Sequence, residues 1–230
     1  MGYRHVFFDL DHTLWDADAN SAEALRELYV KHELHKKGIT DAQEFISKYI
    51  EVNQVFWDQY AKGTMSKQTL RYKRFLVVLQ YFGVKDYDLS YRLSDEYVLL
   101  APHKSIVQPY THEVLEYLSK KYVLHILTNG FEDAQYDKLK ASKIDQCFKH
   151  VITAERAGSK KPSPLIFEFA LKLAQAKASE SIVIGDNLEV DVLGAKQAGL
   201  DQVYFNLTGR KHSETITYEI RSLKELMEIL

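Results

Sequence analysis

From residue 110 onward two kinds of segment alternate regularly, and this alternation constrains the fold of the chain more than any other feature. Short apolar runs rich in β-branched and aromatic residues are typical of buried strands, and the stretches between them carry apolar residues at helical spacing. Strands and helices in this order build right-handed βαβ units, which predict a parallel sheet with helices on both faces. The expected strands are residues 3–9, 122–128, 150–155, 181–186 and 202–206, and the expected helices after residue 110 are 111–120, 132–143, 164–176, 190–198 and 222–230.

A long segment with no convincing strand separates the first expected strand from the second. It carries apolar residues at helical spacing, with glycines at the breaks between its helical patterns. We therefore expect an α/β core of residues 1–15 and 110–230, into which an all-helical unit is inserted as residues 16–109, linkers included. The helical patterns of this unit lie near residues 20–36, 41–61, 66–82 and 87–100.

Composition excludes several classes of protein. The 230 residues are 46% hydrophobic and 27% charged, which indicates a folded globular chain and not a disordered or fibrous one. A formal net charge of −2 argues against a nucleic-acid polymer as partner and favours small-molecule chemistry. Cys147 is the only cysteine, so no intrachain disulfide can form, and we expect a cytoplasmic protein. No apolar run is long enough to predict a membrane partner, and the sequence gives no sign of the oligomeric state.

Polar side chains gather where the expected strands end. In an open parallel sheet, ligands bind at the carboxyl ends of the strands, near the point where the strand order reverses. We therefore expect these side chains to share one pocket. They are Asp9, Asp11, His12 and Thr13 after the first strand, Thr128, Asn129 and Gly130 after the second, Lys160 and Lys161 after the third, and Asp186, Asn187 and Asp191 after the fourth.

This set of residue types predicts a phosphate pocket beside a nucleophile. Several carboxylates at one sheet edge repel one another, so the pocket needs a cation. Carboxylate and carbonyl oxygens suit Mg²⁺, which commonly shares its coordination shell with a phosphate oxygen. Lys161 adds a second positive charge and Thr128 a hydroxyl, while the backbone N–H groups of Asn129 and Gly130 can face an anion at a helix start.

Phosphoryl transfer assigns a role to each of the first two aspartates. Our hypothesis is that Asp9 attacks phosphorus to form an aspartyl-phosphate, and that Asp11 protonates the leaving oxygen and then activates the hydrolytic water. Lys160 is an alternative to Lys161 as the functional lysine, but adjacency to Pro162 favours Lys161.

The motifs DLDHT, LTNG, KKP and GDNLEVD, in this order, resemble the four motifs of the haloacid dehalogenase (HAD) superfamily of phosphohydrolases. The resemblance implies a Rossmann-like core, with Asp9 as nucleophile and Asp11 as acid and base. It also implies that the Asp9 side chain, the Asp11 carbonyl and Asp186 hold Mg²⁺. Thr128 and Lys161 would then hold the phosphoryl group. Three supporting residues are expected around these groups, namely Asp191, which would orient Lys161 or a metal-bound water, Asn187 and Thr13. Many relatives have glycine where this chain has His12, which leaves the local loop contact open.

By the same resemblance, the helical insertion is similar to a type-1 cap, the lid that selects the substrate. Residues 51–75, 127–131 and 157–171 look similar to the YjjG-like branch, whose members are 5′-nucleotidases acting on pyrimidine nucleoside monophosphates. The substrate implied is a small phosphomonoester, most specifically a nucleoside 5′-monophosphate. The cap residues that would then face the nucleoside are Phe56, Trp57, Tyr60, Arg71 and Arg74.

Several alternatives stay open at this point. Each motif alone could be an ordinary turn or helix cap, and aromatic residues at helical spacing are more often core than a binding surface. A sugar-phosphate phosphatase or phosphomutase would use the same core chemistry. A dehalogenase would not need an acid at Asp11. A phospho-accepting signalling module, or a silent binding module, would share the acidic pocket, but the first has no large helical lid and the second would not need a complete catalytic set.

Overall fold

The computed structural model describes residues 2–230, which form two compact units. One unit consists of the chain up to Asp16 together with Ser105–Leu230, and the other is Ala17–Lys104. Within the described part of the chain, no helix is long and apolar enough to cross a membrane.

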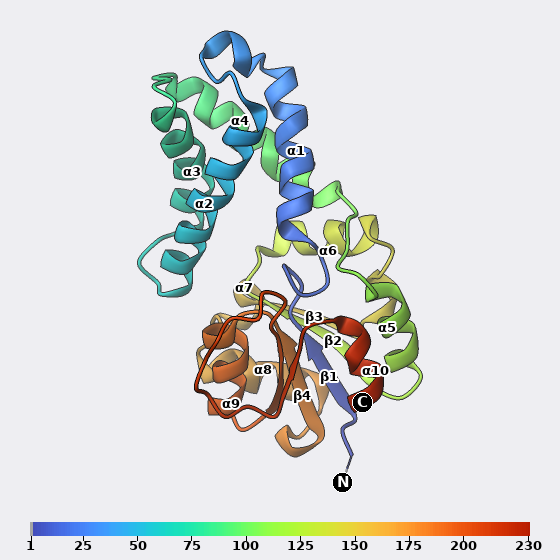
Figure 1. The fold of residues 1–230 in the computed structure, drawn as a ribbon. Coiled ribbons are helices and arrows are strands. Elements are labelled where there is room, and N and C mark those ends of the chain that lie inside the picture. Colours follow the sequence, from blue (N-terminus) through green and yellow to red (C-terminus); the bar gives the residue numbers. More distant parts are fainter. Residues whose placement is uncertain (1) are drawn as a thin grey trace. The chain divides into compact units, whose positions relative to one another are not determined.

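A parallel sheet forms the centre of the first unit. Its strand order over the described residues is β3-β2-β1-β4-β5-β6 (Figure 1). β1 lies between β2 and β4, and His5 pairs with Val123 on one side and with Ser181 on the other. The strand order therefore reverses at β1, whose carboxyl end is the expected place for a ligand. The strands are β1 His5–Phe8, β2 Val123–Thr128, β3 His150–Thr153, β4 Ser181–Gly185, β5 Asp201–Phe205 and β6 Tyr218–Ile220.

Helices cover both faces of this sheet. α8 and α9 lie on one face, where Phe7 and Leu127 of the strands pack in one cluster with Ile166 and Phe167 of α8. α5 contacts β2 and lies with α10 on the opposite side (Figure 1). β1 and β4 are buried along their whole length because both faces are covered. The helices of this unit are α5 Thr111–Ser119, α6 Glu132–Ala141, α7 Ala154–Ala157, α8 Pro164–Ala174, α9 Leu193–Gln197 and α10 Leu226–Ile229.

The second unit is built from helices only. Side chains of Asp41, Ser66 and Asp86 cap its second, third and fourth helices by accepting hydrogen bonds from N–H groups of the first turn. Its centre is aromatic, with the Tyr49 ring 4.9 Å from that of Phe75. The helices are α1 Ala17–Lys31, α2 Ala42–Ala61, α3 Lys67–Tyr81 and α4 Tyr87–Leu100.

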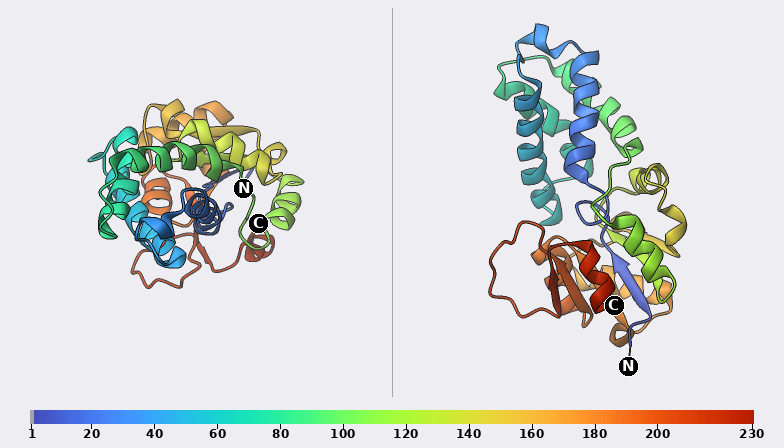
Figure 2. Two further views of the ribbon diagram at one scale, coloured as in Figure 1. Left: turned by 90° about the horizontal axis from the view of Figure 1, so that it is seen from above. Right: turned by 45° about the vertical axis from the view of Figure 1, so that its right-hand side comes forward.

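The predicted fold class is confirmed, but the prediction omits β6. This strand has three residues and pairs with β5 at the edge of the sheet, Val203 opposite Tyr218. The intervening residues 206–217 contain no helix or strand and loop out from the sheet (Figure 2). A strand this short has no sequence period of its own, so only its pairing with β5 defines it.

Three predicted elements differ in extent or kind from the observed ones. β3 ends at Thr153, because the Thr153 hydroxyl accepts a hydrogen bond from the Arg156 N–H and starts α7. The helix expected at 190–198 begins as a π-helical turn over Leu188–Val192 and continues as α9. The helix expected at 222–230 is a 3-10 turn, Leu223–Glu225, followed by the short α10.

Candidate active site

The chain leaves β1 at Asp9 and turns sharply over the carboxyl end of the sheet. The Asp9 N–H still donates to the Ile184 carbonyl of β4, at 2.8 Å. The turn then closes on itself, since the His12 N–H donates to the Trp15 carbonyl at 2.8 Å. His12 has φ of 65°, the left-handed region in which glycine is favoured. The loop thus keeps a glycine-like conformation although this chain has histidine there.

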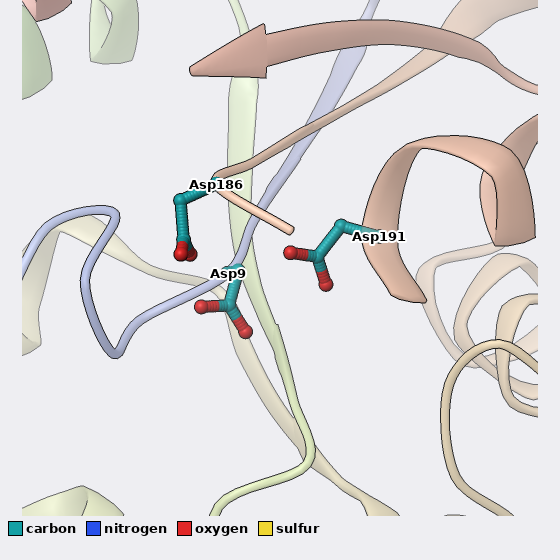
Figure 3. Close-up of side chains that lie close together, drawn as sticks. All are labelled: Asp9, Asp186 and Asp191. Carbon is teal, nitrogen blue, oxygen red and sulfur yellow. The ribbon is translucent and has the colours of Figure 1, made fainter. Parts of the chain in front are cut away.

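Three carboxylates converge at this edge of the sheet. Asp9 follows β1, Asp186 follows β4, and Asp191 lies in the π-helical turn after β4. Their side chains point toward one another (Figure 3), and one oxygen of each lies within 4.8 Å of the others. Gly185 permits this approach, because a Cβ at that position would lie 2.5 Å from the Asp191 side chain.

A buried lysine bridges two of these carboxylates. Lys161 Nζ lies 2.6 Å from Asp9 Oδ1 and 2.6 Å from Asp191 Oδ1, and it donates to the Leu127 carbonyl at 2.7 Å. The lysine is 1% exposed, so its charge is compensated by these carboxylates and not by water. The structure therefore brings Asp9, Lys161, Asp186 and Asp191 together, as the strand-end pattern predicts.

The loop after β2 positions the lysine through Asn129. The Asn129 amide donates to the Lys161 carbonyl at 2.9 Å, and its oxygen accepts from the Lys161 N–H at 2.8 Å. Both ends of this side chain are thus engaged with the Lys161 backbone. The Gly130 N–H donates to the Thr128 hydroxyl at 2.9 Å, which bends the loop back over the end of β2.

Thr13 and Asn187, the other two predicted supporting residues, donate hydrogen bonds to the acidic cluster. Thr13 Oγ1 donates to Asp186 Oδ1 at 3.0 Å. The Asn187 N–H donates to Asp191 Oδ2 at 3.0 Å, while the Asn187 side chain accepts from the Val190 N–H at 3.0 Å. Asp191 therefore has one oxygen on Lys161 and the other on a backbone N–H, which leaves Asp9 and Asp186 as the carboxylates more open to a cation.

The electrostatics of the cluster favour an additional cation. Burial raises the pKa of Asp9 well above its usual range, and the charges of Asp191 and Asp186 add to the shift, although Lys161 opposes it. Burial and the charge of Asp191 raise the pKa of Asp186 to about 6, against the effects of His12 and the Thr13 hydrogen bond. Burial lowers the pKa of Lys161, but Asp191 and Asp9 outweigh it and raise that pKa above its usual value. One ammonium group thus leaves the three carboxylates undercompensated. Their hard oxygen donors fit a divalent ion such as Mg²⁺.

The Asp11 side chain pairs with a different lysine. Its Oδ1 is 2.5 Å from Nζ of Lys138, a residue of α6. Sequence reasoning missed Lys138. It falls within the predicted helix 132–143, and nothing in that helical pattern distinguishes it from a solvent-facing lysine.

Two of the five residues assigned to the nucleoside are packed inside the helical unit. Phe56 is 8% exposed and Arg74 is 5% exposed. The Arg74 guanidinium lies 4.7 Å from the centre of the Tyr97 ring and donates to Asn53 Oδ1 at 3.0 Å. The other three, Trp57, Tyr60 and Arg71, are partly exposed.

Comparisons with known proteins agree on one family. The model of the haloacid dehalogenase-like hydrolases matches residues 3–199. Pyrimidine 5′-nucleotidase PynA of Streptococcus pneumoniae is 30% identical, covering 100% of this chain and 96% of the relative. Pyrimidine 5′-nucleotidase YjjG of Escherichia coli is 27% identical over 100% of this chain and 99% of its own. Among solved structures, the HAD-hydrolase YfnB of Bacillus subtilis bound to magnesium has a TM-score of 0.89 at 28% identity, covering 100% of this chain and 99% of that one.

Proposed function

The chain belongs to the haloacid dehalogenase-like hydrolases, and on this basis we propose that it is a Mg²⁺-dependent phosphatase that hydrolyses small phosphomonoesters through an aspartyl-phosphate at Asp9. The observation that carries the proposal is the buried ammonium of Lys161 held between Asp9 and Asp191 at the end of β1. A nucleophilic carboxylate beside a fixed cation is the arrangement that attack on an anionic phosphate requires.

Each residue of the site then has a separate task. Asp9 attacks phosphorus, and Lys161 and the Thr128 hydroxyl neutralise and orient the phosphoryl oxygens. Asp11 gives a proton to the leaving oxygen and takes one from the water that cleaves the intermediate. Asp191 and Asn129 keep Lys161 in place through the contacts described above.

Mg²⁺ suits this site because the single positive charge of Lys161 does not balance the negative charge of the carboxylates. Asp9 and Asp186, with the backbone carbonyl of Asp11, would hold Mg²⁺. When bound, the ion would supply charge neutralisation for the phosphoryl group. Support comes from the buried acidic cluster and from the magnesium found in the YfnB structure.

The substrate that we propose is a pyrimidine nucleoside 5′-monophosphate. Two relatives that match over the whole chain are pyrimidine 5′-nucleotidases. We propose that the helical unit Ala17–Lys104 acts as the cap that selects among phosphomonoesters, and that its partly exposed residues Trp57, Tyr60 and Arg71 contribute to this choice.

The test is phosphate release from a panel of nucleoside 5′-monophosphates, sugar phosphates and small organic phosphates, with Mg²⁺ and with a chelator. We expect release without any acceptor sugar, a preference for cytidine or uridine 5′-monophosphate, and loss of activity on chelation that added Mg²⁺ restores. Full activity in the presence of the chelator would refute the requirement for Mg²⁺. Turnover that requires an acceptor sugar would indicate a phosphomutase. Preference for a sugar phosphate would refute the nucleotidase assignment while leaving the phosphatase intact.

A further inference from the structure

Lys138 forms an ion pair with Asp11 that is separate from the Lys161 cluster. The two side chains are 12% and 26% exposed, and their charged atoms are 2.5 Å apart. Lys161 contacts Asp9 and Asp191, whereas Asp11 is paired with Lys138. Lys138 and Lys161 therefore pair with different carboxylates of the site.

The position of Lys138 is fixed from two sides. Its Nζ lies 4.4 Å from the centre of the Trp15 ring, and Trp15 closes the turn that carries Asp11. A cation over an indole face is attracted to it. Gln135, three residues earlier on α6, is buried against Gly130, where a Cβ would lie 2.4 Å from its side chain. Residues three apart lie on one face of a helix, so this face of α6 meets both the loop after β2, at Gly130, and the turn that carries Asp11.

A carboxylate that must meet a leaving oxygen needs a defined position. Asp11 is the most exposed of the site carboxylates whose ion pairs are described above, and it lies on a turn and not on a strand. Without a partner, its side chain would be free to sample several rotamers. Misplacing a catalytic group by about 1 Å can reduce a rate by about 100-fold.

We propose that Lys138 is a positioning residue for Asp11, holding its side chain where the protonated form gives its proton to the leaving oxygen and the resulting carboxylate then takes one from the hydrolytic water. The inference rests on the proposed function, because it takes Asp11 as the acid. If Lys138 has this role, its loss should lower kcat/KM most for substrates whose leaving oxygen needs a proton.

The experiment compares two phosphomonoesters, each assayed with the 230-residue chain and Mg²⁺. The leaving group of cytidine 5′-monophosphate is the 5′-oxygen of cytidine, a poor leaving group as an alkoxide, so it needs the proton. The leaving group of p-nitrophenyl phosphate is p-nitrophenolate, a stable anion that does not need it. For Lys138→Met we expect kcat/KM on the nucleotide to fall by about 10- to 100-fold, and on the aryl phosphate by less than about threefold. Lys138→Arg, which keeps the charge and can stack on Trp15, should recover most of the nucleotide activity.

The controls separate the outcomes. Lys140→Met changes an exposed lysine of the same helix and should leave both substrates unaffected. Activity on the aryl phosphate shows that a variant is folded, and Lys138→Gln replaces Lys138→Met if the latter melts below the assay temperature. An equal loss of kcat/KM on both substrates would overturn the inference, because it is the result expected of a lysine that binds phosphate or supports the fold. An unchanged kcat/KM on both substrates would also overturn it. Failure of the proposed function would appear differently, as a wild-type protein that hydrolyses neither substrate.

Discussion

Single residues outside the cluster of Lys161 and the three carboxylates determine the geometry of this site. Asn129 uses both ends of one amide to hold the backbone of Lys161, and Gly185 leaves room for the Asp191 carboxylate. Both residues affect the position of the Lys161 ammonium group between Asp9 and Asp191. Buried polar groups are stable only when all of them are hydrogen-bonded. A substitution at either residue should therefore disturb the contact between Lys161 and Asp9.

Asn129→Ala tests this dependence. Removing the amide leaves the Lys161 N–H and carbonyl without their partners, so we expect the loop to relax and kcat for phosphate release to fall by at least about 10-fold. Steady-state kinetics measure the effect, with a thermal melt as the control for folding. Wild-type kcat in a folded Asn129→Ala protein would contradict the role assigned to this amide.

At the scale of elements, the ends of the strands explain why the sequence predicts so much of the site. Asp9 and Asp186 are widely separated in the chain, but each follows one of two neighbouring parallel strands that end at one edge, so their convergence follows from the strand pattern. Lys138 could not be found this way, because its contact with Asp11 depends on how α6 is rotated against the turn. The role of Asn129 toward Lys161 depends likewise on how two loops approach each other.

A stack of histidines crosses three neighbouring strands. His5 of β1, His125 of β2 and His150 of β3 lie side by side, with ring centres 5.5 and 5.3 Å apart. His125 is 0% exposed. Burial lowers its pKa to about 3, and the positive charges of His150, His5 and Lys149 add to the shift. Burial also lowers the pKa of His5 and of His150.

These histidines should make the fold sensitive to acid. In the unfolded chain His125 takes up a proton below its usual pKa of about 6.5, whereas in the folded protein it stays neutral down to about pH 3. The unfolded state thus binds more protons in this window, and the free energy of unfolding should fall as the pH drops from about 6.5 toward 3. Above pH 6.5 the stabilisation from neutral His125 is fully present.

His125→Leu should weaken this pH dependence. It replaces a titratable ring by an apolar side chain, so it should remove up to about 1.4 kcal/mol per pH unit from the slope of unfolding free energy between pH 6 and 4. Urea denaturation at several pH values measures the slope. An unchanged slope would show that other groups, such as the carboxylates of the active site, account for acid sensitivity.

At the scale of the whole molecule, the chain combines a parallel α/β unit that holds the acidic cluster with a helical unit inserted after β1. The strand ends supply chemistry that any phosphomonoester could use. Selection among substrates must then come from other surfaces, and the proposal assigns it to the helical unit. Sequence alone could not separate the residues proposed to contact substrate from those of the core, because Phe56 and Trp57 are consecutive aromatic residues of one helical pattern, and only Phe56 is buried.

Trp57→Ala tests the assignment of selectivity. If the Trp57 side chain contributes to choice of the nucleoside, its removal should lower kcat/KM for cytidine 5′-monophosphate by about 10-fold and leave p-nitrophenyl phosphate nearly unchanged. Tyr87→Ala, which removes an aromatic side chain that is 58% exposed in the same unit, serves as the matched control. An identical substrate profile in Trp57→Ala and wild type would remove Trp57 from the proposed substrate surface.

The proposed phosphatase mechanism depends on Asp9 accepting a phosphoryl group. The most direct measurement is mass spectrometry of peptides from protein quenched with acid during turnover of a phosphomonoester in the presence of Mg²⁺. We predict a phosphoryl group on the peptide that contains Asp9, absent from the Asp9→Asn variant, which should also be inactive. A phosphoryl group on another residue, or an Asp9→Asn protein with wild-type turnover, would contradict the role of Asp9 as the nucleophile.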